Sequence, residues 1–66
     1  MIAKVGDLVM TRYDRRWAIV IKTWWIGPPY KEQAVEFIYA DGTRGTQPIN
    51  HIVNIVNGDD NGSKEG

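Results

Sequence analysis

The residues best suited to bind a ligand lie within one stretch of six, residues 12–17, which read Arg-Tyr-Asp-Arg-Arg-Trp. Guanidinium groups hold phosphates through paired hydrogen bonds, and aromatic rings give nucleobases a stacking surface worth about 1–3 kcal/mol for each base. One hypothesis is therefore a nucleic-acid-binding surface, with the candidate residues Arg12, Tyr13, Arg15, Arg16, Lys22 and Arg44. The competing interpretation is a charged turn between two strands, in which Asp14 neutralises part of the positive charge.

Aromatic side chains are a second candidate for binding. The chain has three Trp, three Tyr and one Phe, which is more large rings than the inside of so small a domain can hold. Trp24 and Trp25 are adjacent, and neighbours in a strand point to opposite faces, so both cannot lie in the core. Since Trp and Tyr are favoured at interfaces, we predict a surface that binds protein or self-associates, made of Trp17, Trp24, Trp25, Tyr30 and Tyr39. The alternative is that one ring packs over Pro28, Pro29 and Tyr30 and closes the end of the domain.

Residues for catalysis or metal binding are scarce. The chain has no cysteine, and its one histidine, His51, has no second histidine with which to hold a metal ion. The carboxylates fall on expected turns, loops and strand surfaces, with no pairing suited to acid–base catalysis. Asp41 and Gly42 belong to a hairpin turn rather than to a phosphate-binding loop. We therefore expect no enzyme activity, no cofactor and no metal.

Length and charge indicate one small domain. A chain of 66 residues with a formal net charge of zero allows a single domain and lacks the strongly basic composition of most nucleic-acid-binding domains. Residues 57–66 carry three acidic side chains and one basic side chain and no apolar side chain to offset the entropy of ordering. We predict a folded domain at residues 1–56 and a disordered acidic tail at residues 57–66. No signal peptide and no run of about 18 apolar residues is present, so we expect a cytoplasmic location and no membrane partner.

Short apolar runs separated by turn residues predict strands rather than helices. The five expected strands span residues 7–12, 17–25, 33–39, 43–47 and 52–56. Asp41 and Gly42 predict a tight hairpin, because its turn requires positive φ, and Pro48 starts a short 3-10 turn before the last strand. The expected fold is all-β, a small five-stranded antiparallel barrel. Alternation within the strands predicts the core residues Val9, Ile19, Ile21, Val35, Phe37, Ile49, Ile52 and Ile55.

Four segments are similar to those of a known group of proteins. They read Val-Gly-Asp-Leu-Val at residues 5–9, Ala-Ile-Val-Ile at 18–21, Val-Glu-Phe-Ile-Tyr-Ala-Asp-Gly at 35–42 and Pro-Ile-Asn-His-Ile at 48–52. Over residues 4–56 the chain resembles the short SH3-like barrel proteins of uncharacterised bacteriophage and bacterial open reading frames. The resemblance implies an SH3-like barrel with the shape of KOW and Tudor-like modules, which bind nucleic acid or protein segments between long loops. A phage-encoded protein of this kind would lie in the host cytoplasm or in the virion.

This resemblance does not imply an activity, because one fold hosts many functions. One enzyme group among SH3-like barrels, the plasmid-type dihydrofolate reductases, uses a Val-Gln-Ile-Tyr motif in a tetrameric pore. The nearest segment here is Thr-Gln-Pro-Ile at residues 46–49, which lacks the tyrosine and contains a proline, so this enzyme class is the remotest alternative. We predict a non-enzymatic interaction module that binds protein or forms a homo-oligomer, with a nucleic-acid-binding barrel as the alternative.

Overall fold

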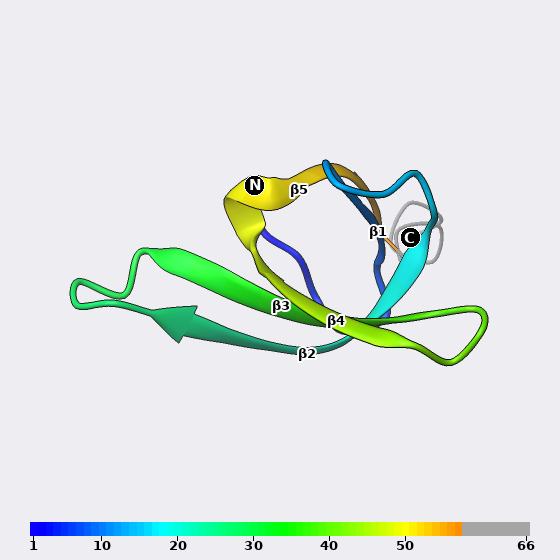
Figure 1. The fold of residues 1–66 in the computed structure, drawn as a ribbon. Coiled ribbons are helices and arrows are strands. Elements are labelled where there is room, and N and C mark those ends of the chain that lie inside the picture. The colour runs from blue at the N-terminus through cyan, green and yellow to red at the C-terminus, as the bar shows by residue number, and fades with distance from the viewer. Residues whose placement is uncertain (58–66) are drawn as a thin grey trace, which may run out of the picture.

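The computed structural model describes residues 1–57, which form five antiparallel strands and one 3-10 turn with no α-helix among them (Figure 1). The elements are β1 (Leu8–Thr11), β2 (Ala18–Ile26), β3 (Glu32–Tyr39), β4 (Arg44–Pro48), η1 (Ile49–His51) and β5 (Ile52–Val56). The all-β class, the five strands and the 3-10 turn before the last strand are confirmed. The predicted acidic tail lies outside the described residues, except for Asn57.

All five strands belong to one sheet, in the order β4-β3-β2-β1-β5. β2 pairs with β3 from Ala18 to Ile26, whereas its pairing with β1 covers only Ala18 and Ile19. Within residues 1–57 no ladder joins β4 to β5, so the sheet has two edges. The closure expected of a barrel is therefore not seen in the hydrogen bonding.

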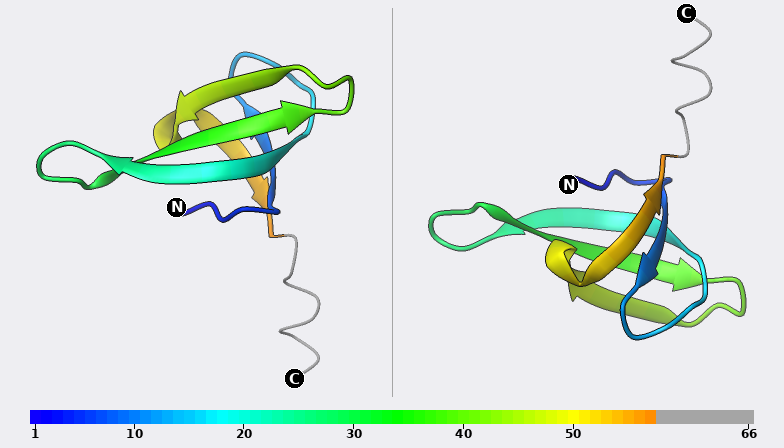
Figure 2. Two further views of the ribbon diagram at one scale, coloured as in Figure 1. Left: turned by 90° about the horizontal axis from the view of Figure 1, so that it is seen from below. Right: turned by 90° about the horizontal axis from the view of Figure 1, so that it is seen from above.

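The β2–β3 hairpin extends beyond the rest of the sheet as a long arm (Figures 1 and 2). We use the name arm for residues 21–35, which comprise the second half of β2, the loop and the start of β3. The register of β2 against β3 shifts between Val20 and Lys22, and such a bulge bends a strand and increases its twist. The first half of β2 can therefore pair with β1, while the second half continues along β3 beyond the end of the β1 pairing.

The hydrophobic core lies on the inner face of the curved sheet. Its fully buried members include Val9, Val20, Val35 and Phe37. Of the expected core residues, Val9, Val35, Phe37 and Ile52 are buried, and Ile49 and Ile55 pack against the core while partly exposed.

Two core predictions in β2 are wrong. Ile19 is 47% exposed and Ile21 is only half-buried, while Ala18 and Val20 point inward. Ile19 pairs with Ile38 on the outer face of the sheet. Residues 18–21 are all apolar, so alternation does not show which set faces the core, and a shift of one residue exchanges the two faces.

The N-terminal segment is attached to the arm through a buried amide. The Ala3 N–H donates to Gln33 Oε1 at 2.9 Å, and Gln33 Nε2 donates to the Ala3 carbonyl at 2.7 Å. The buried carboxylate of Asp7 accepts hydrogen bonds from the Lys4 N–H and from Asn57 Nδ2. These contacts hold both ends of the described chain against the sheet. None of residues 1–57 forms a helix long and apolar enough to cross a membrane.

Candidate interaction surface

The basic loop between β1 and β2 is organised around Arg16. Its Nε and Nη2 atoms bond Asp14 Oδ2 at 3.0 and 2.9 Å, and its Nη1 bonds Asp41 Oδ2 at 3.3 Å. The guanidinium carbon lies 4.0 Å from the centre of the Tyr39 ring. Arg16 therefore joins this loop to the β3–β4 hairpin, and its charge is compensated by two carboxylates of the same chain.

Hydrogen bonding to the Arg16 side chain is the main cause that holds the pKa of Asp14 below its ordinary value of 3.8. The pKa of Asp41 is also lowered, chiefly by hydrogen bonds from the backbone N–H and the hydroxyl of Thr43 and less by Arg16. Both carboxylates therefore remain ionised to lower pH than free aspartate, because each is bonded in its charged form.

Replacing Arg16 with alanine is expected to raise the pKa of Asp14 toward its ordinary value and to change that of Asp41 less. NMR titration of the Asp14 and Asp41 carboxyl carbons in the wild type and in Arg16→Ala measures both changes in pKa. Since the folded pKa of Asp14 lies below the unfolded one, its ionic bond contributes stability above pH about 4, which is lost as the pH falls through the folded pKa. Equal changes at Asp14 and Asp41 would contradict the assignment of Arg16 to Asp14.

The other candidate nucleic-acid residues are divided between the loop and the sheet. Arg12 and Arg15 are exposed in the loop, and the Arg12 guanidinium lies 5.2 Å from the Tyr13 ring. Lys22 is opposite Glu36 in the β2–β3 pairing, and Arg44 is opposite Ile38 in the β3–β4 pairing. With Arg16 compensated by Asp14 and Asp41 and the other cations divided between the loop, β2 and β4, the positive charge is not concentrated in one place.

Tyr13 and His51 form a structural contact between the β1–β2 loop and η1. The Tyr13 hydroxyl lies 3.1 Å from His51 Nδ1, which lies 2.9 Å from Gln47 Oε1. The Tyr13 and His51 rings meet edge to face at 5.3 Å. Residues 1–57 contain no group of three His, Cys, Asp or Glu side chains placed to hold a metal ion.

The predicted aromatic surface is divided into two groups. Trp24, Trp25 and Tyr30 lie on the arm, where Trp25 is 48% exposed, Tyr30 is 62% exposed and Trp24 is half-buried. Trp17 and Tyr39 lie at the other end of β2 and β3. Tyr39 packs edge to face on Phe37 at 5.6 Å and lies under Arg16, so its ring contributes more to the interior than to a contact surface.

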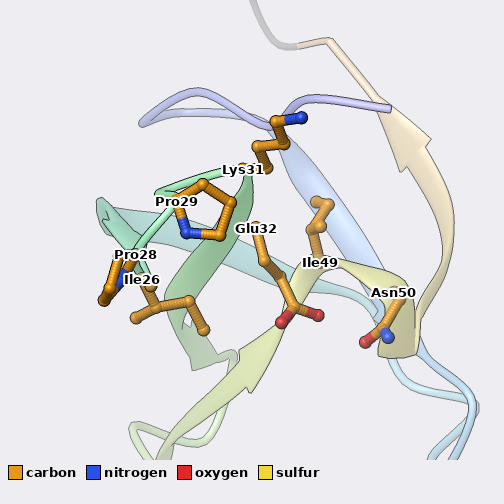
Figure 3. Close-up of a pocket in the computed structure, with 8 residues that line it drawn as sticks. Ile26, Pro28, Pro29, Lys31, Glu32, Ile49 and Asn50 are labelled. Carbon is orange, nitrogen blue, oxygen red and sulfur yellow. The ribbon is translucent and has the colours of Figure 1, made fainter.

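A groove lies where the arm loop meets η1 (Figure 3). Its volume is about 440 Å³, and we call it the arm groove. Figure 3 shows Glu32 lying between Pro29 and Ile49. The lining residues are Ile26, Gly27, Pro28, Pro29, Lys31, Glu32, Ile49 and Asn50. A second hollow, of about 420 Å³, is lined by Arg15, Arg16, Trp17, Tyr39, Ala40 and Asp41.

Each aromatic group thus lies near a hollow, and the arm has the more exposed rings of the two. No family model matches this chain, and neither a curated protein nor a solved structure matches it.

Two surfaces were not predicted from the sequence. The first is the outer edge of the arm, where residues 21–26 of β2 have a strand on one side only among residues 1–57. The second is an apolar row across the outer face of the sheet, in which Val56, Leu8, Ile19 and Ile38 are consecutive cross-strand partners. The sequence carried a signal for the open edge of the arm, since residues 21–26 have one charge among six residues and so lack the charges that usually protect an edge strand. The second was missed because Ile19 was assigned to the core.

Proposed function

We propose that this protein is a non-enzymatic interaction module on an SH3-like scaffold, and that it binds protein through the arm. The strand order β4-β3-β2-β1-β5 and the 3-10 turn between β4 and β5 support the SH3-like assignment. Fold alone does not define a function, so the proposal depends on the surface of the arm.

The observation that carries the proposal is the exposure of large apolar side chains on an arm that leaves the sheet. Trp25, Ile26 and Tyr30 are all exposed, and Ile26 lines the arm groove together with Pro29 and Ile49. Contiguous exposed apolar surface marks interaction sites on soluble domains. Aromatic anchors beside a pocket are the usual centre of a protein interface, where charged side chains are depleted.

The basic loop supports nucleic-acid binding less well. Phosphate binding requires free guanidinium groups, and Arg16 is already bonded to Asp14 and Asp41. The Tyr13 ring has one contact with His51, which reduces the surface it offers to a base. Arg12, Arg15 and Arg44 are exposed outside this ion-pair network, but they are divided between the loop and β4, and so few separated cations give only a weak electrostatic attraction that salt would screen.

Replacing Trp25 with alanine is expected to change the free energy of unfolding by less than about 1 kcal/mol, because the side chain is already half exposed. The affinity for a peptide bound by the arm should fall by about 30-fold or more, as for an interface anchor. The probe is a peptide selected from a random library on the immobilised protein, and its dissociation constant is measured by fluorescence titration.

Trp17→Ala is the matched control, because Trp17 is exposed to a similar extent but lies away from the arm. Selected peptides should bind this variant as they bind the wild type. Peptides that tolerate Trp25→Ala and lose affinity in Trp17→Ala would move the binding surface to the second hollow and contradict the proposal.

A further inference from the structure

The second half of β2 is an open strand edge. β1 pairs with β2 only at Ala18 and Ile19, and the backbone bonds that continue on that side join Val20 to Gly6 and Asp7. In the described part of the chain, residues 21–26 of β2 pair with β3 alone. The bonds that attach Ala3 to the arm are to the side chain of Gln33 and not to the β2 backbone.

The register shows which backbone groups face this edge. In an antiparallel pair, alternate residues direct their N–H and C=O groups toward the same partner strand. The Tyr39 N–H donates on the side of β4, so every second residue of β3 counted back from Tyr39 also faces β4, and the residues between them face β2. Lys22 and Trp24 pair with residues of this second set, so their N–H and C=O groups point toward β3. The N–H and C=O groups of Thr23 and Trp25 therefore point away from β3, to the open edge.

The side chains of this edge do little to block another strand. Proteins commonly protect an exposed edge with charged residues, proline or a covering loop. Here the only charge in residues 21–26 is Lys22, and its Nζ atom lies 5.5 Å from the centre of the Trp24 ring. Trp25 and Ile26 are exposed beside it. The edge therefore presents unpaired backbone groups together with apolar side chains, which is the combination that strand addition uses.

We propose, building on the proposed function, that the partner of this edge is the same edge of a second copy of the chain. The two β2 strands pair antiparallel about a two-fold axis, with Thr23 opposite Trp25 of the second copy and Trp25 opposite its Thr23. In this register the outward N–H and C=O groups of Thr23 and Trp25 in one copy form hydrogen bonds with those of the second copy. The register is self-complementary, because the spacing of the two residues is the same in both directions.

The same register suits the side chains. Trp24 lies on the axis, opposite Trp24 of the second copy, in a non-hydrogen-bonded position where cross-strand aromatic pairs are favourable. Lys22 lies opposite Ile26 of the second copy, so no like charges face each other across the new pair. A partner of different sequence would need side chains that fit Lys22, Trp24 and Ile26, whereas a second copy supplies this fit by symmetry.

Sedimentation of the wild type and two variants of Thr23 tests the pairing. Thr23→Pro removes an N–H that points to the open edge and leaves the β2–β3 ladder intact, since edge strands accept proline. Thr23→Val keeps that N–H. We expect the wild type and Thr23→Val to dimerise with increasing concentration, and Thr23→Pro to dimerise at least about tenfold more weakly because it loses backbone bonds. Dimerisation that is the same in all three proteins would overturn the pairing.

A single cysteine tests the register, since the chain has none of its own. Trp24→Cys places two thiols at the axis, where facing Cα atoms are about 4.5 Å apart and within reach of a disulfide. Lys22→Cys is the matched control, because its two copies would lie about four residues apart along the strands, roughly 13 Å. Mild oxidation should link Trp24→Cys into a dimer and leave Lys22→Cys monomeric in denaturing electrophoresis. Linkage of Lys22→Cys alone, or of both to the same extent, would overturn the register.

These outcomes separate the dimer from the proposed function. A wild type that stays monomeric at about 100 µM, while selected peptides still bind and require Trp25, would overturn the dimer and leave the arm as a protein-binding surface. A wild type that neither dimerises nor binds any selected peptide would overturn both.

Discussion

Replacing Phe37 with alanine is expected to destabilise the protein by about 3–5 kcal/mol, the usual effect of removing a buried ring. The ring is only 2% exposed and contacts Tyr39 edge to face. It also fills the space beside Gly45, where an added Cβ would lie 2.7 Å from Phe37 Cε1. A domain of this length has roughly 3–10 kcal/mol of stability, so this loss is a large share of the total. Urea unfolding followed by tryptophan fluorescence measures the loss.

Ile19→Ala is the matched control for that prediction. Ile19 is an apolar strand residue like those of the core, but the structure places it on the outer face, half exposed. Its replacement should therefore cost less than about 1 kcal/mol. A loss as large as that of Phe37→Ala would mean that β2 presents the opposite face to the core.

Replacing Gln33 with leucine is the second substitution expected to have a large effect. The Gln33 amide is buried, and it bonds both the N–H and the carbonyl of Ala3. Leucine keeps the bulk but leaves both backbone groups without that partner, at about 1–3 kcal/mol for each buried group left unsatisfied. Thermal unfolding of the variant should show a clearly lower midpoint than the wild type.

Deleting residues 1–3 gives the control for the Gln33 prediction. In the shortened chain the backbone groups of Ala3 are gone, so Gln33→Leu should cost less there than in the full chain. The difference between the two backgrounds measures the coupling of the two groups. The same cost in both backgrounds would show that Gln33 acts through packing and not through the Ala3 hydrogen bonds.

The fold was predictable from the sequence where local signals agree. Alternation in β3 placed Val35 and Phe37 on the core side, and Asp41 with Gly42 marked the hairpin. The expected turn type was wrong, because it requires positive φ at both residues and, of the two, only Gly42 has it, at 91°. The phase of β2 was not predictable, because Ala18 and Ile19 are both apolar and only the register with β3 shows which faces inward. Propensity identified the strand, and tertiary pairing chose its face.

The candidate site was predictable in composition but not in arrangement. The excess of rings correctly indicated that some must lie outside the core, and Trp25 does. That Arg16 bonds Asp41 depends on a contact between residues 25 positions apart, and no local pattern reports it. The open edge of β2 was equally hidden, since it depends on where the pairing with β1 stops.

Amide hydrogen exchange at Thr23 and Trp25 tests most directly whether the arm edge is the surface that contacts another chain. In a dilute sample both amides should exchange rapidly, as edge groups without a partner do. At high protein concentration both should become protected, while the exposed loop amides of Arg12 and Arg15 stay fast. Exchange at Thr23 and Trp25 that is the same at every concentration, with and without a selected peptide, would contradict the account.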